Sequence, residues 1–170
     1  MILGMSTASF TLLHVVLSLV GIAAGLVLVA AMLRSNAARG WTALFLASTV
    51  LTSVTGFFFP RDQVLPSHVV GVISLLVLLI AIVALYGYRL ARSWRWIYVV
   101  GAFVALWLNI FVLIAQAFQK VAFLKALAPT QSEPPFVIAQ VIVLVVLVVF
   151  GFRALRFFHP EAQPAAPHPA

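Results

Sequence analysis

Apolar residues form five long runs along the chain, and short polar or basic segments separate these runs. An α-helix needs about 20 predominantly apolar residues to cross the hydrocarbon core of a bilayer, which is about 30 Å thick. Each run is long enough for one crossing, so the pattern predicts an all-α integral membrane bundle of five transmembrane helices. The predicted spans are approximately Phe10–Leu33, Trp41–Phe59, Ser67–Tyr88, Trp96–Phe118 and Phe136–Leu155.

The overall composition agrees with a membrane protein. Hydrophobic residues make up 65% of the chain and charged residues 8%, which is outside the range of soluble globular domains. The polar connections are too short to bury a hydrophobic core of their own. We therefore predict one transmembrane domain over residues 1–158. The remaining residues, 159–170, are rich in proline and poor in bulky apolar side chains, so we expect a disordered cytoplasmic tail.

Basic residues divide unevenly between the two sides that five spans define. The first side receives a set of arginines, namely Arg34, Arg39, Arg89, Arg92, Arg95, Arg153 and Arg156. The second side receives only Arg61, Lys120 and Lys125. Because short cytoplasmic loops retain lysine and arginine, we predict a bacterial inner-membrane protein with an external N-terminus and a cytoplasmic C-terminus. The net charge of +7 then follows from the topology and does not indicate a nucleic-acid partner.

The tripeptide His-Val-Val occurs at His14 and again at His68, each time near the start of a long apolar run. The same separation of 54 residues brings Arg39–Trp41 onto Ser93–Arg95. Each unit would then be a helical hairpin with a basic turn. Two alternatives follow: a pair of parallel hairpin repeats before a fifth helix, or a chance recurrence in a valine-rich chain.

Polar side chains within the predicted spans fall at similar depths, near the outer ends of the spans. In the first span, His14 shares a helical face with Gly21 and Gly25, and the two glycines have the spacing that allows close helix approach. His14 should therefore face neighbouring helices. We predict a polar pocket in the outer half of the membrane, lined by His14, His68, Asn109, Gln116 and Gln140.

The two histidines raise the question of a cofactor. An intramembrane histidine is a candidate functional residue by default, and imidazoles from two helices can hold the iron of haem b. His14 and His68 begin spans that run in the same direction, so they are candidate axial ligands. The chain has no cysteine, which excludes covalent c-type haem attachment. In the alternative reading, both histidines only hydrogen-bond to neighbouring helices or to interfacial water.

Two other ligands stay open at the same pocket. His14 and His68 could hold a non-haem metal ion together with Asp62 or Glu133, because two imidazoles and a carboxylate form a common ligand set. The histidine, glutamine and asparagine donors could instead hold the carbonyl head of a quinone or a lipid headgroup beneath the aromatic segment Phe57–Phe59. The spacing of these residues does not choose between the ligands.

Enzymatic and transport functions have little support in the sequence. The only acidic side chains are Asp62, Glu133 and Glu161, and Glu161 lies on the side opposite the other two. We therefore predict no catalytic residues. No predicted span carries a charged residue in its central part, which disfavours an ion-coupled carrier. A small transporter is thus the second alternative, behind a haem-binding or quinone-binding electron-transfer protein.

The outer connection Gln116–Phe136 combines two lysines with several prolines. We expect its first part to continue the fourth span or to form an interfacial helix, with Lys120 and Lys125 directed to headgroups. Two interpretations of this connection stay open. It is either a capped connector or a lid over the polar pocket.

In general plan, the chain resembles small uncharacterised multi-pass inner-membrane proteins of bacteria. The resemblance covers the hydropathy pattern of the five spans and the segment APTQSEPPF, Ala128–Phe136. It implies no particular activity and transfers no site residue. We therefore expect an accessory or structural subunit of a membrane complex, in contact with the lipid bilayer and with other membrane subunits or further copies of the chain.

Overall fold

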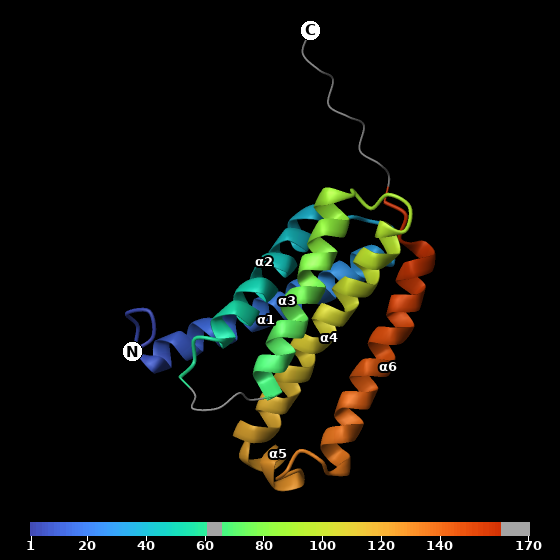
Figure 1. Cartoon of the computed structure of the whole chain (residues 1–170). Coiled ribbons are helices and arrows are strands. Elements are labelled where there is room, and N and C mark those ends of the chain that lie inside the picture. Colours follow the sequence, from blue (N-terminus) through green and yellow to red (C-terminus); the bar gives the residue numbers. More distant parts are fainter. Residues whose placement is uncertain (61–65, 161–170) are drawn as a thin grey trace.

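The computed structural model of the protein describes residues 1–60 and 66–160. The protein is all-α, as the hydropathy pattern predicts, and 79% helical, with no strand in the part described. The elements are α1 (Thr7–Met32), α2 (Arg39–Gly56), α3 (Pro66–Ile82) with its π-helical continuation η1 (Val83–Gly87), α4 (Trp94–Lys120), α5 (Ala122–Leu127) and α6 (Pro134–Phe157). Helices α3, α4 and α6 run up and down, and α1 crosses them obliquely (Figure 1).

Four helices within the described residues are long and apolar enough to cross a membrane, which indicates a multi-pass membrane protein. They are Thr7–Met32, His68–Gly87, Trp94–Lys120 and Pro134–Phe157. The prediction of five such helices is wrong at the second span, Trp41–Phe59, which folds as α2. The 18 residues of α2 are too polar to qualify, because the helix begins at Arg39 and carries many hydroxyl side chains: Thr42, Ser48, Thr49, Thr52, Ser53 and Thr55.

The helices pack in a chain of neighbours. α2 returns alongside α1, and α3 packs on α4. Contacts of α2 with α3 and of α1 with α4 join these two pairs. α6 packs mainly on α4, and it lies at the edge of the bundle (Figure 1). The first four long helices therefore form one group, with α6 attached to its α4 side. The proposed parallel repeat of two hairpins stays a prediction.

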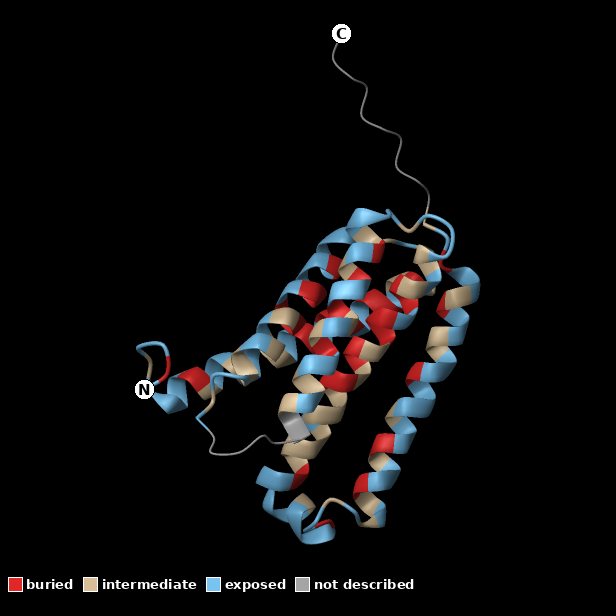
Figure 2. Cartoon of the chain, viewed as in Figure 1, coloured by how far each residue is buried: buried red, intermediate tan, exposed pale blue. Residues whose placement is uncertain are grey.

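The hydrophobic core lies between the helices of this group. Leu28, Phe45 and Leu106 come from α1, α2 and α4, and each is at most 2% exposed. A Cβ atom at Gly25 would lie 2.7 Å from Leu106 Cδ1 and 3.0 Å from the ring of Phe45, so glycine allows α1 to approach closely, as its spacing from Gly21 predicts. Figure 2 shows that buried positions face the interior of the bundle and exposed positions cover its outer surface.

Hydrogen bonds tie three helix ends together at the arginine-rich end of the bundle. Arg95 Nη1, in the first turn of α4, donates to the carbonyl oxygens of Leu155 at 3.0 Å and Phe158 at 2.8 Å. These carbonyls belong to the last turn of α6 and its C-cap, where the helix itself supplies no partners. The backbone N–H of His159 donates to Ser35 Oγ at 2.9 Å. The ends of α1, α4 and α6 are therefore held at one level.

The opposite end of α4 and α6 is closed by the short helix α5 and the turn after it. Phe118, Ala128 and Phe136 form a small apolar cluster there, and Gln131 Nε2 donates to the carbonyl oxygen of Ala115 at 2.6 Å. α4 runs as far as Lys120 before α5 begins. The prediction that the first part of the connection Gln116–Phe136 is helical is thus confirmed.

Candidate functional site

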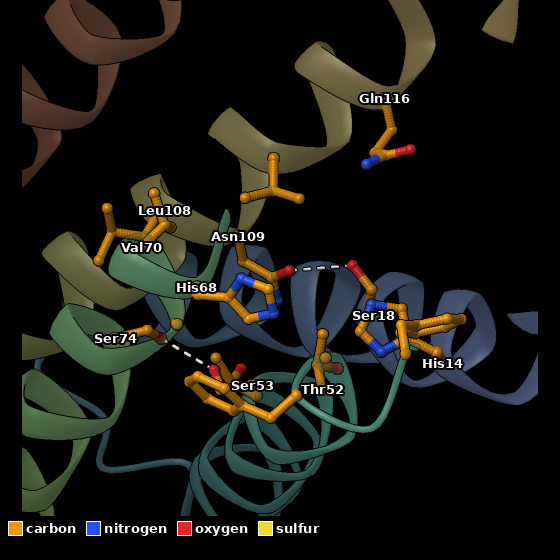
Figure 3. Close-up of a pocket in the computed structure, with 16 residues that line it drawn as sticks. His14, Ser18, Thr52, Ser53, His68, Val70, Ser74, Leu108, Asn109 and Gln116 are labelled. Carbon is orange, nitrogen blue, oxygen red and sulfur yellow. Dashed lines mark hydrogen bonds between the residues drawn. The ribbon is translucent and has the colours of Figure 1, made fainter. Parts of the chain in front are cut away.

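A cavity of about 140 Å³ lies inside the group formed by α1, α2, α3 and α4. We call it the polar cavity, because hydroxyl, amide and imidazole side chains converge on it from all four helices (Figure 3). The polar residues that line it are His14, Ser18, Thr49, Thr52, Ser53, His68, Ser74, Asn109 and Gln116. Apolar side chains, among them Phe57 and Phe59, complete the wall.

His14 is fixed by a hydrogen bond between α1 and α2. Its Nδ1 atom lies 2.8 Å from Thr55 Oγ1, and the Thr55 hydroxyl donates its single proton to the carbonyl oxygen of Leu51 at 2.7 Å. The Thr55 oxygen therefore accepts from His14, which assigns the ring proton to Nδ1 and the unprotonated lone pair to Nε2. The edge of the ring also packs on Phe59, with centroids 5.3 Å apart.

His68 reaches the cavity from the first turn of α3. Its ring lies against that of Phe57, with centroids 5.7 Å apart and an angle of 32° between the planes. A Cβ atom at Gly71 would lie 3.0 Å from the same phenyl ring. The missing side chain at Gly71 thus makes room for Phe57, which lines the cavity.

Asn109 in α4 is the central amide of the cavity (Figure 3). Its Oδ1 atom accepts a hydrogen bond of 2.9 Å from Ser18 Oγ in α1, whereas its buried Nδ2 atom has no partner among the described residues. A Cβ atom at Gly21 would lie 3.1 Å from Asn109 Nδ2 and 3.1 Å from Thr49 Oγ1. Gly21 therefore leaves space for these polar atoms, and α1 approaches closely at this level too.

Some hydroxyl groups of α2 have a hydrogen-bond partner, and others have none among the described residues. Ser48 Oγ donates back to the carbonyl oxygen of Leu44 at 2.6 Å, and Ser53 Oγ donates across to Ser74 Oγ of α3 at 3.1 Å. Thr49 Oγ1 and Thr52 Oγ1 are buried and have no hydrogen-bond partner in the part of the chain described. Buried polar groups normally have a protein or water partner, so these two hydroxyls can bond to a water molecule or another polar group in the cavity.

The structure brings together four of the five pocket residues predicted from the sequence. His14, His68, Asn109 and Gln116 line the polar cavity. Gln140 does not, because α6 packs on a different side of α4, where Gln140 Nε2 donates to the carbonyl oxygen of Phe111 at 3.2 Å. No residue of α5 lines the cavity either, so this helix is a connector at the α4–α6 end and not a lid over the cavity.

The metal-site hypothesis gains no support from the described residues. They contain no group of three or more histidine, cysteine or acidic side chains that could hold a metal ion. Glu133, one of the two carboxylates considered, precedes α6 and does not line the cavity. The other, Asp62, lies outside the described residues.

A haem does not fit the polar cavity. Pockets for drug-sized ligands have volumes of about 300–1,000 Å³, and a haem macrocycle is at least as large as such ligands. The cavity measures about 140 Å³, and aromatic rings pack directly on both imidazoles. The two histidines share one cavity, as the haem hypothesis requires, but the space between the helices does not admit the macrocycle.

The polar residues of α2 extend the site beyond the sequence-based set. Thr49, Thr52 and Ser53 line the cavity, and the signal for them is the dense run of hydroxyl residues within an apolar segment. Such a run is most easily accommodated where a helix faces a polar interior. The comparison of this chain with protein-family models, curated proteins and solved structures gives no match.

Proposed function

We propose that the protein is a membrane subunit that binds a neutral ring bearing carbonyl oxygens, such as a quinone headgroup, in the polar cavity. The observation that carries the proposal is the set of buried cavity-lining atoms without a partner, Asn109 Nδ2, Thr49 Oγ1 and Thr52 Oγ1. An amide nitrogen can only donate hydrogen bonds, and a threonine hydroxyl can donate one. A guest with acceptor oxygens would satisfy all three groups.

The size and charge of the cavity favour the same class of ligand. Its volume of about 140 Å³ is close to that of an engineered cavity of about 150 Å³ that binds benzene, so one six-membered ring fits. Among the residues that the structure describes, no aspartate, glutamate, lysine or arginine lines it, which favours a neutral guest because a buried charge needs a partner. The aromatic rings of Phe57 and Phe59 offer apolar contacts to the faces and edge of such a ring.

His14 adds an acceptor to this donor-rich wall. Its Nε2 atom carries the unprotonated lone pair when Nδ1–H donates to Thr55. A hydroxyl on the ring could donate to Nε2, whereas a carbonyl would use the amide and threonine donors. The cavity therefore suits both a quinone and the corresponding quinol, and a subunit that holds either one would serve a membrane electron-transfer complex.

The proposal includes a membrane crossing by α2. The face of this helix that carries Ser48 and Thr49 is buried in the bundle, whereas Leu44 and Leu51 are 42% and 48% exposed. An apolar outer face beside α1 is compatible with lipid, even though the polar inner face lowers the mean hydropathy of the helix. Five crossings would then place the N-terminus outside and the C-terminus in the cytoplasm of a bacterial inner membrane, as the basic residues predict.

The earlier alternatives have less support. A transporter would be expected to carry ionisable groups near the middle of its path. Among the described residues, the ionisable side chains that line the polar cavity are His14 and His68, towards the starts of α1 and α3. A haem would require a wider separation of the helices. The accessory-subunit interpretation agrees with this proposal, because quinone binding would give such a subunit a specific function in a membrane complex.

The test replaces Asn109 by leucine, which has a similar volume and no donor. We expect this substitution to weaken the binding of a short-chain quinone by about two- to tenfold, the loss expected for one neutral hydrogen bond. Isothermal titration calorimetry on the protein in detergent micelles would measure the dissociation constant. The matched control is Gln140→Leu, which removes a buried amide outside the cavity and should leave the dissociation constant unchanged.

Two results would contradict the proposal. The first is wild-type protein that binds no quinone, and the second is an equal loss of affinity in the Asn109 and Gln140 variants. An absorption spectrum with a Soret band that disappears in both His14→Ala and His68→Ala would instead favour the haem alternative.

A further inference from the structure

A second hollow lies on the other side of α4 from the polar cavity. We call it the lipid-facing groove. It has a volume of about 300 Å³, lies between α4 and α6, and exposes no polar surface. Val100 and Phe103 of α4 and Val148 and Phe152 of α6 are among the residues that line it. Both helices are candidate membrane spans, so the groove opens toward the hydrocarbon of the bilayer.

Arginines border one end of this groove. Arg95 precedes the lining residue Val99 by one helical turn, and Arg156 follows the lining residue Phe152 by one turn. Arg95 is held in place by its bonds to the end of α6, while Arg92, Arg153 and Arg156 are exposed. The only acidic side chain within the described residues, Glu133, stands at the opposite end of α6. The groove therefore has apolar walls and basic side chains near one end.

We propose that this groove binds one anionic phospholipid, with an acyl chain between α4 and α6 and the phosphate at the arginines. The apolar walls exclude a polar occupant, because an unpaired polar group in such a site is costly. The basic rim favours a headgroup with net negative charge, and basic pockets between transmembrane helices at the cytoplasmic side are suited to such lipids. This site is separate from the polar cavity and does not depend on what that cavity binds.

The position of α6 gives the bound lipid a structural consequence. α6 packs mainly on α4, and much of its surface is exposed, including Ile142 at 57% and Phe152 at 65%. An acyl chain in the groove would contact both helices at once and fill space that their own side chains leave open. Contacts of this kind are individually small and collectively large. The anionic lipid should therefore stabilise the attachment of α6.

The test compares phosphatidylglycerol with phosphatidylcholine of identical acyl chains, added back to delipidated protein in detergent. We expect tighter binding and a larger increase in Tm with phosphatidylglycerol, measured by native mass spectrometry and thermal unfolding. The variant Arg156→Gln should lose about fivefold in affinity. The matched control, Arg34→Gln, removes the same charge from the turn between α1 and α2 and should retain wild-type affinity.

A second variant pair tests the acyl-chain part of the site. Leu144→Trp places a larger side chain in the groove and should reduce the retention of both lipids, whereas Leu76→Trp, on an exposed position of α3, should not. Equal affinity for the two lipids would overturn the proposal. So would an equal loss in the Arg156 and Arg34 variants, because the attraction would then be a diffuse effect of net charge. Quinone titration of the same variants should be unchanged, which separates this result from that of the polar cavity.

Discussion

Two glycines of α1 allow this helix to approach α2 and α4 closely. Gly21 faces polar atoms of Asn109 and Thr49, and Gly25 faces the side chains of Leu106 and Phe45. The first contact borders the polar cavity and the second seals the hydrophobic core below it. One helix face thus meets both the polar side chains of the cavity and the hydrophobic core, and small residues at both positions allow α1 to approach closely.

Replacing Gly25 by leucine should destabilise the protein by about 1–3 kcal/mol, the usual cost of forcing extra volume into a packed core. Even a Cβ atom would lie 2.7 Å from Leu106 and 3.0 Å from Phe45, so the helices would have to separate. Chemical unfolding in detergent would measure the change. Gly40→Ala is the control, because no atom lies within 4 Å of a Cβ atom there. Equal stability of the Gly25 variant and the wild type would contradict the assigned packing.

At the scale of helices, hydropathy predicts those elements that are apolar on every side. α1, α3, α4 and α6 face lipid or core around most of their circumference, and all four were expected from the apolar runs. α2 departs from this rule because one face lines the polar cavity while the other remains apolar. Mean hydropathy averages the two faces, so it cannot distinguish such a helix from one that lies outside the membrane.

The sequence predicts only part of the polar cavity, because it does not show which helices are neighbours. Depth along a span can be read from the sequence, and it correctly groups His14, Asn109 and Gln116. It does not tell which neighbour a helix face meets. Gln140 therefore lies at a comparable depth but bonds to Phe111 on another side of α4. The hydroxyls of α2 enter the site only once the pairing of α2 with α1 and α3 is known.

The connection before α6 is stabilised by one carboxylate. Glu133 accepts hydrogen bonds from the backbone N–H groups of Thr130 and Ser132 and from the Thr130 hydroxyl. Desolvation raises the pKa of the Glu133 carboxyl, but these bonds and the backbone N–H of Glu133 itself lower it more, so the net pKa lies below the usual glutamate range. The ionised carboxylate is thus the form that the folded turn favours.

Glu133→Gln should lower the Tm at neutral pH, and the difference from the wild type should close in acid. A pKa lowered by folding contributes stability that is fully present above the unfolded value, about 4.3, and is lost as the pH falls through the folded pKa. Thermal unfolding of both proteins from pH 7 downward would measure the gap. A Tm difference that stays constant over this pH range would show that Glu133 stabilises the turn through its shape and not through its charge.

At the scale of the whole molecule, charge and polarity are arranged along one axis. The arginines of the turns and of the α6 terminus gather at one end, where Arg95 ties α4 to α6. The histidines of the polar cavity lie near the starts of α1 and α3, which face the other end. In the proposed orientation, a quinone would be held toward the external side and an anionic lipid toward the cytoplasm. The side of the membrane on which each proposed site lies therefore depends on how many helices cross it.

The absence of cysteine from the chain allows this topology to be tested with single introduced cysteines and a membrane-impermeant thiol reagent. Ser6→Cys and Thr130→Cys should react in intact cells, whereas Asn36→Cys and Arg156→Cys should react only after permeabilisation. The reason is that the five proposed crossings, α2 included, would put the segments before α1 and after α6 on opposite sides of the membrane. If α2 does not cross, Ser6→Cys and Arg156→Cys must label on the same side, and the crossing count would then equal the four helices that are apolar enough to span.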